Sequence, residues 1–159
     1  MKPRSAAAIV LGIALACLGP WGCGDSDHPH AEDSHAAGGH AHEPKYGGKL
    51  IELGEHEGNV ELVLDPAAGK LTLYVLDAHA ENFVRLPLET ISVTAEATDG
   101  PKTLVLKPVA NPVTGETPGN TSQFEGVEEW LKTSPKLTGR IPELPVKSKT
   151  YRDIAFQLP

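Results

Sequence analysis

The chain has 159 residues and a formal net charge of -7, with 21 acidic against 14 basic side chains. This acidic balance argues against nucleic acid and anionic lipid as electrostatic partners and favours cations. Both cysteines, Cys17 and Cys23, lie at the amino-terminal end, so a disulfide within the body of the protein is excluded.

Residues 1–23 are predicted to form a lipoprotein-type signal peptide. Two basic residues precede the apolar run A-A-A-I-V-L-G-I-A-L-A-C-L, which is shorter than the about 20 residues that span a bilayer. The end of the run resembles a bacterial lipoprotein signal, in which a cysteine receives the lipid. The residues before Cys17 fit the lipoprotein signal motif, in which a small residue precedes the cysteine, better than those before Cys23, so Cys17 is slightly favoured. Cys23, however, stands directly before a polar tether. The alternative is ordinary cleavage beyond both cysteines, without a lipid.

Residues 24–44 are predicted to be a flexible tether, because they contain no large apolar residue whose burial could offset the entropy lost on ordering. The tether combines histidines with acids and has no Lys or Arg. Imidazole and carboxylate suit zinc, copper and nickel, and a flexible chain can wrap H-P-H and H-A-H pairs around an ion. The alternative is a solvated spacer. The candidate metal ligands are His28, His30, His35, His40 and His42.

Residues 45–159 are predicted to form one all-β domain organised around a hairpin. Residues 60–64 and 71–75 each alternate apolar and other side chains, and Pro66 and Gly69 break the run between them. If Asp65 pairs with Lys70 across a four-residue loop, opposing residue numbers sum to 135. The apolar side chains of both strands then share one face; sums of 133 and 137 would keep them there too.

The same register, extended outward, predicts the one candidate site in the folded part. It brings His56 opposite His79, with Asp77 and Glu81 on the same face of the second strand. Directly opposed Cβ atoms lie about 4.5 to 5.5 Å apart, close enough for two imidazoles to share a zinc or copper ion. The alternative is that these four residues are polar rim residues where the strands leave the core.

The remaining pattern predicts an antiparallel β-sandwich of about seven or eight short strands. An Asp99-Gly100 turn should join two strands into a second hairpin, and the spacing of apolar residues over 127–131 predicts one short helix. Further strands are expected over residues 49–53, 83–86, 90–97, 103–107, 122–126, 137–141 and 150–158.

Several stretches resemble a group of small bacterial envelope lipoproteins: G-G-K-L-I-E-L-G, H-E-G-N-V-E-L-V-L-D, G-K-L-T-L-Y-V-L-D-A-H-A and S-Q-F-E-G. Their domain is similar to the N-terminal β-domain of periplasmic adaptor subunits of heavy-metal efflux pumps. The resemblance covers most of residues 45–158. It implies the periplasmic side of the envelope, a β-sandwich, a link to transition metals, and metal-efflux or other envelope proteins as partners. The chain lacks the coiled-coil hairpin and lipoyl-like parts of a complete adaptor.

The sequence contains no G-x-S-x-G elbow and no glycine-rich phosphate loop, and the body has no cysteine nucleophile. We therefore expect no enzyme. The expected function is that of a membrane-anchored envelope lipoprotein that binds or delivers a transition metal ion, as an accessory to metal efflux. The alternative is a protein-interaction β-sandwich on a spacer, with no metal role.

Overall fold

The computed structural model describes residues 42–97 and 99–159; the predicted signal peptide and nearly all of the tether lie outside this part of the chain. The regular elements of the described part are antiparallel strands and one short 3-10 helix, and none of its helices is long and apolar enough to cross a membrane. The elements are β1 (Lys49–Leu53), β2 (Gly58–Asp65), β3 (Lys70–Leu76), β4 (Ile91–Ala97), β5 (Gly100–Pro108), β6 (Gln123–Val127), η1 (Glu129–Thr133), β7 (Leu137–Val146) and β8 (Lys149–Leu158).

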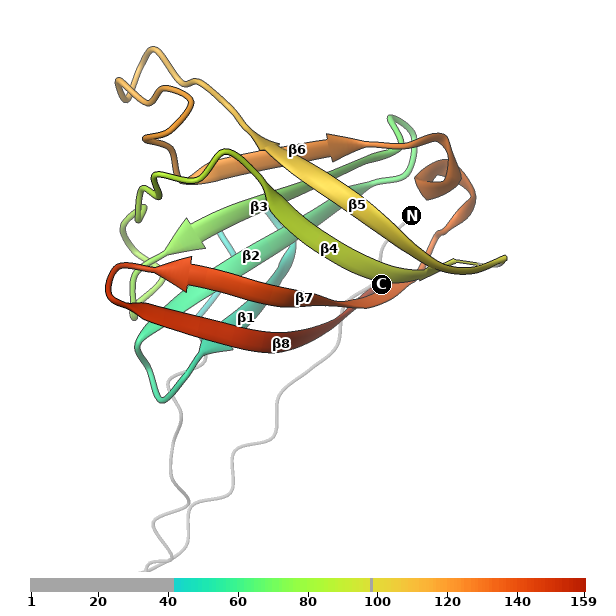
Figure 1. Ribbon diagram of the computed structural model, residues 1–159, viewed down its shortest axis with the longest axis horizontal. Helices are drawn as coiled ribbons and strands as arrows, with labels where there is room; N and C mark the ends of the chain where they lie inside the picture. The colour runs from blue at the N-terminus through green and yellow to red at the C-terminus, as the bar shows by residue number, and fades with distance from the viewer. Residues whose placement is uncertain (1–41, 98) are drawn as a thin grey trace, which may run out of the picture. The chain divides into compact units, whose positions relative to one another are not determined.

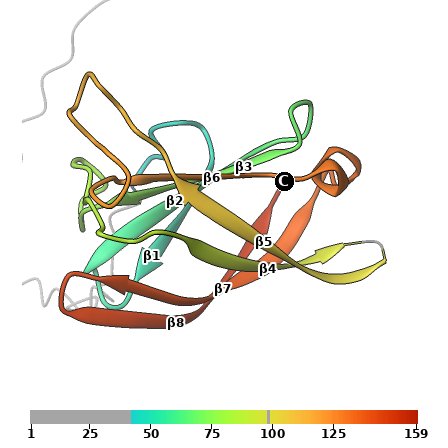
Figure 2. The same cartoon turned by 45° about the horizontal axis from the view of Figure 1, so that its top comes forward.

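The strands form one sheet in the order β1-β2-β3-β6-β5-β4-β7-β8 (Figure 1), which confirms the all-β prediction. A ladder of only two residue pairs, Lys107 with Glu125 and Pro108 with Phe124, joins β5 to β6. The sheet bends there, so that β1, β2, β3 and β6 lie across from β5, β4, β7 and β8 (Figure 2). The two predicted layers are thus two halves of one nearly closed sheet.

The register of the organising hairpin is confirmed. Along β2 and β3, Asp65 pairs with Lys70 and Leu62 with Leu73, and the residue numbers of every pair sum to 135. The second predicted hairpin is also present, since β4 and β5 pair from Ile91 with Leu106 to Ala97 with Gly100. Alternation specifies these registers because a shift by one residue would move every apolar side chain to the outer face.

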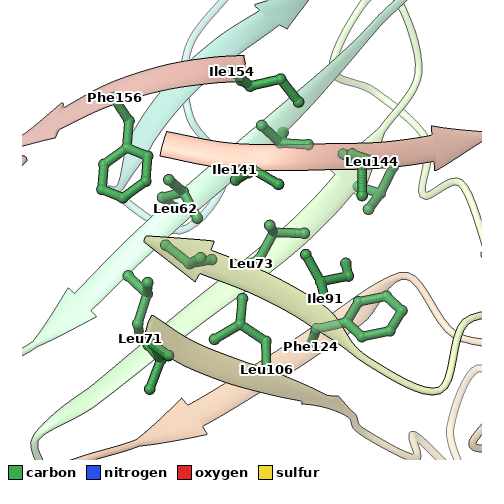
Figure 3. Close-up of a cluster of buried hydrophobic side chains, with 14 of the residues drawn as sticks. Leu62, Leu71, Leu73, Ile91, Leu106, Phe124, Ile141, Leu144, Ile154 and Phe156 are labelled. Atoms are coloured by element: carbon green, nitrogen blue, oxygen red, sulfur yellow. The ribbon is translucent and has the colours of Figure 1, made fainter. Parts of the chain in front are cut away.

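The core fills the space between the two halves of the sheet (Figure 3), and all eight strands of the described part contribute to it. Leu62, Leu73 and Phe124 are completely buried, and burial of each such side chain contributes about 1.5 to 3 kcal/mol. Ile154, Phe156 and Leu158 of β8 are also part of the core.

Two local predictions differ from the structure in detail. The short helix is a 3-10 helix, η1, which begins two residues later than expected and buries Leu131. Residues 83–86 form no strand; they make only isolated bridges, one between Leu76 and Phe83 and one between Leu86 and Thr121. Pro87 follows immediately and lacks the backbone N–H that a longer ladder would need.

Candidate metal site

His56 lies in the tight turn between β1 and β2, not on an extension of β2. Gly54 and His56 adopt the left-handed conformation, with φ of 63° and 56°, and Glu57 N donates to Leu53 O at 3.1 Å. The side chain of Glu52 holds the turn by accepting the backbone N–H of His56 at 2.8 Å. The predicted pairing of His56 with His79 is therefore wrong, because the chain turns back before the β2 register could continue.

His79 belongs to a loop after β3 that is built around Asp77. The Asp77 carboxylate accepts the backbone N–H groups of Glu81 at 2.9 Å and Asn82 at 3.2 Å. Burial opposes ionisation of Asp77, yet these bonds and one from the Asn82 side chain hold its pKa below the usual value. The predicted placement of Asp77 on a strand face is wrong, because β3 ends at Leu76 and the Asp77 oxygens organise the loop that follows.

Asn59, which is almost completely buried in β2, fixes this loop to the sheet. Its side-chain NH2 group donates to the carbonyl oxygens of Asp77 at 2.9 Å and Ala78 at 3.0 Å. Glu81 has an exposed side chain at the far end of the loop, and its carbonyl oxygen accepts a bond from the Lys45 ammonium group. His79 is thus carried on a well-connected loop, with its own side chain exposed.

A carboxylate on β2 docks the segment that precedes β1. Glu61 is completely buried on the outer side of the sheet, where it accepts the backbone N–H groups of Lys45 and Tyr46 at 2.8 Å and Gly48 at 2.9 Å. Bonds to an ionised acceptor are stronger than neutral ones, and three amides satisfy a group that would otherwise be costly to bury. Gly48 passes so close to β2 that a Cβ there would overlap Leu62 O.

An aromatic stack continues this docking contact. The rings of Tyr46 and Tyr74 lie 3.9 Å apart between centroids with an interplanar angle of 14°, and Phe83 lies 6.2 Å from Tyr46. Burial, followed by the charges of neighbouring groups including Glu125, raises the pKa of Tyr74 to about 12. Both tyrosines therefore remain neutral at physiological pH, and stacking such as theirs contributes about 0.5 to 1.5 kcal/mol beyond the area buried.

The docked segment brings a tether histidine to the Asp77 loop. The rings of His42 and His79 lie 5.9 Å apart between centroids, edge to face at 72°. Within residues 42–97 and 99–159 no three His, Cys, Asp or Glu side chains gather as a potential metal cluster. The structure thus brings together two of the predicted ligands, His42 and His79, whereas His56 lies in the turn between β1 and β2. The remaining predicted ligands, His28, His30, His35 and His40, and the lipidation candidates Cys17 and Cys23, lie outside the described residues.

No family model, curated protein or solved structure matches this chain. The resemblance to envelope lipoproteins accordingly stays a prediction from the sequence.

Sequence reasoning missed the residues that position His42. Glu61 was visible only as an outward polar residue in an apolar strand. A sum of 135 does place Glu61 directly opposite Tyr74, as observed. Such a pair also suits a solvent-exposed face, so the register by itself does not show that this face is covered.

Proposed function

We propose that this chain is a non-enzymatic metal-binding protein of the cell envelope, in which His42 and His79 form the folded part of a zinc or copper site. The proximity of their two rings, 5.9 Å apart between centroids, carries the proposal. Zinc holds each imidazole nitrogen at about 2.0 to 2.1 Å, so two imidazoles on one ion have centroids about 5 to 6 Å apart. The observed 5.9 Å lies within this range, and each ring would turn so that one of its nitrogens points at the ion.

Further ligands come from the tether. His40 stands two residues before His42, and three more histidines precede it. Tetrahedral zinc takes four ligands, and the tether can supply whichever of these the folded domain lacks. The folded pair then gives the tether a fixed point, which lowers the entropy that the other tether histidines lose on binding.

The charge of the chain supports a cation as the ligand. The formal net charge of the whole chain is -7. Removal of Lys2 and Arg4 with the predicted signal peptide leaves 21 acidic against 12 basic side chains, a net charge near -9. A field of this sign raises the local concentration of divalent cations. A lipid on the amino-terminal cysteine would hold the protein at the envelope membrane, where delivery to a metal-efflux partner is the proposed role.

The test is a zinc titration of the full chain against a competing chelator. His79→Ala should weaken binding of the first zinc ion at least about tenfold, because an ion held by loose tether histidines alone lacks its fixed ligand. His56→Ala is the matched control: it also removes an exposed loop histidine, one whose Nδ1 lies 3.4 Å from the Glu52 carboxylate, and should leave the affinity unchanged. Equal affinities for both variants, or no zinc binding by the wild type, would refute the proposal.

A further inference from the structure

The nearly closed sheet has one open seam, between its two edge strands. β1 and β8 end the strand order and lie next to one another (Figure 1), but no ladder joins them in the described part of the chain. Each strand therefore presents unpaired backbone N–H and C=O groups toward the other. Such edges are templates for a further strand, and closed barrels remove them altogether.

Two adjoining troughs of about 510 Å³ each run along this seam. The first lies between residues 49–51 of β1 and 155–157 of β8, and the second continues toward the β1–β2 turn. Ile51 and Ala155 line both, so the troughs form one continuous groove. Each volume falls within the range of about 300 to 1,000 Å³ that is typical of ligand sites.

The two ends of the groove differ. At the end near the β1–β2 turn, Glu57 ties the turn to β8 by accepting bonds from the Lys149 ammonium group and from Tyr151 Oη, the latter at 2.9 Å. Asp153 interrupts β8 near this end with a φ of 50°. The run from Ile154 to Leu158 beyond it alternates buried and exposed side chains regularly, so the Lys49 end offers the better edge for pairing.

The chemistry of the groove defines its occupant. Phe156 and the half-buried Ile51 provide an apolar floor at the first trough. Lys49 is the one charged residue that lines this trough, and it forms no ion pair among the described residues. Although the chain as a whole is acidic, the charge that lines this trough is positive. The trough thus matches an extended backbone with apolar side chains on one face and carboxylates on the other.

We propose that the β1–β8 seam binds an extended acidic peptide segment of a partner protein, which adds as a strand between the two edges. Main-chain hydrogen bonds to β1 and β8 supply affinity, alternate apolar side chains enter the groove, and the outward carboxylates meet Lys49. β1 has five residues and spans about 17 Å, so a short peptide covers it. A full strand takes about 4.8 Å of spacing on each side, so β1 moves outward as the strand enters.

The test uses a fluorescein-labelled peptide of sequence V-E-V-E-V-E-V and the full chain, with binding read by fluorescence anisotropy. Methylation of alternate backbone nitrogens should weaken binding at least about tenfold, because it removes main-chain donors. Lys49→Glu should weaken it about fivefold, and added salt should reduce this difference. The matched control is Lys136→Glu, which reverses an exposed cation outside the seam and should have no effect.

Hydrogen exchange locates the bound peptide and checks the fold of both variants. Amides of residues 49–53 and 154–158 should gain protection on binding, while those of β3 should stay equally protected in the wild type and both variants. Protection at the seam, sensitivity to N-methylation and a specific loss in Lys49→Glu support the proposal. Absence of binding, equal binding of the N-methylated peptide, or equal losses in Lys49→Glu and Lys136→Glu would overturn it.

Discussion

The two faces of the β2–β3 hairpin are covered by different means. Its inner face carries Leu62 and Leu73, which are completely buried against the other half of the sheet. Its outer face is covered by the segment before β1, held by the Glu61 carboxylate and the stacking of Tyr46 on Tyr74. The inner face is therefore stabilised mainly by the hydrophobic effect and the outer face by a few directional bonds, so the outer layer can be detached while the sheet remains folded.

The largest effect is expected from a change on the inner face. Leu73→Ala should lower the free energy of unfolding by about 2 to 5 kcal/mol, because it removes buried methyl groups and leaves a cavity. Urea unfolding followed by circular dichroism measures this change. Val127→Ala, at a side chain that is 62% exposed, should stay within about 0.5 kcal/mol of the wild type. Similar losses in both variants would contradict the assignment of the core.

A smaller and more local effect is expected on the outer face. Glu61→Ala removes the acceptor shared by the amides of Lys45, Tyr46 and Gly48, and should cost about 1 to 3 kcal/mol. Hydrogen exchange should show lost protection in residues 45–48, while β3 stays protected. Zinc affinity should fall as well, since His42 would no longer be held beside His79. Retained protection of residues 45–48 in this variant would show that the carboxylate does not dock the segment.

The smallest effect is expected in the loop that carries His79. Asp77→Ala should cost about 1 kcal/mol at neutral pH, because the loop amides lose their acceptor. The pKa of Asp77 is lowered in the folded protein, so its contribution is complete above the unfolded value of about 3.9 and disappears as pH falls through the folded value.

Stability measured against pH checks the role of Asp77. The difference between the wild type and Asp77→Ala should shrink as the pH is lowered from about 5 toward 3. Glu81→Ala is the control, since its carboxylate makes no hydrogen bond within the described part of the chain and should leave the profile unchanged. If the difference in free energy of unfolding between the wild type and Asp77→Ala instead grows as the pH is lowered, the proposed role of Asp77 is contradicted.

Much of the fold could be predicted from the sequence because alternation carries the required information. Leu62 and Leu73 had to share a face, and the turn residues between Asp65 and Lys70 selected one register from the three that were allowed. Alternation carries no information about residues beyond the ends of the strands. Nothing in the alternation shows that Gly54 and His56 adopt left-handed conformations, so the extension of the register to His56 failed.

The candidate site was harder to predict because it depends on contacts between segments that have no regular pairing. His42 reaches His79 only because Glu61 captures backbone amides of the segment that follows His42. Backbone amides have no sequence signature, since every residue except proline carries one. The histidine composition predicted the ligand types of the proposed site, and the structure places His42 beside His79.

The most direct test of the proposed site is NMR spectroscopy of the imidazole nitrogens during titration of the full chain with zinc. A metal-bound imidazole nitrogen shifts strongly, and each histidine reports separately. At the first equivalent of zinc, the resonances of His42 and His79 should shift together while those of His56 remain unchanged. Shifts confined to residues before His42, or equal shifts of His56 and His79, would contradict the account.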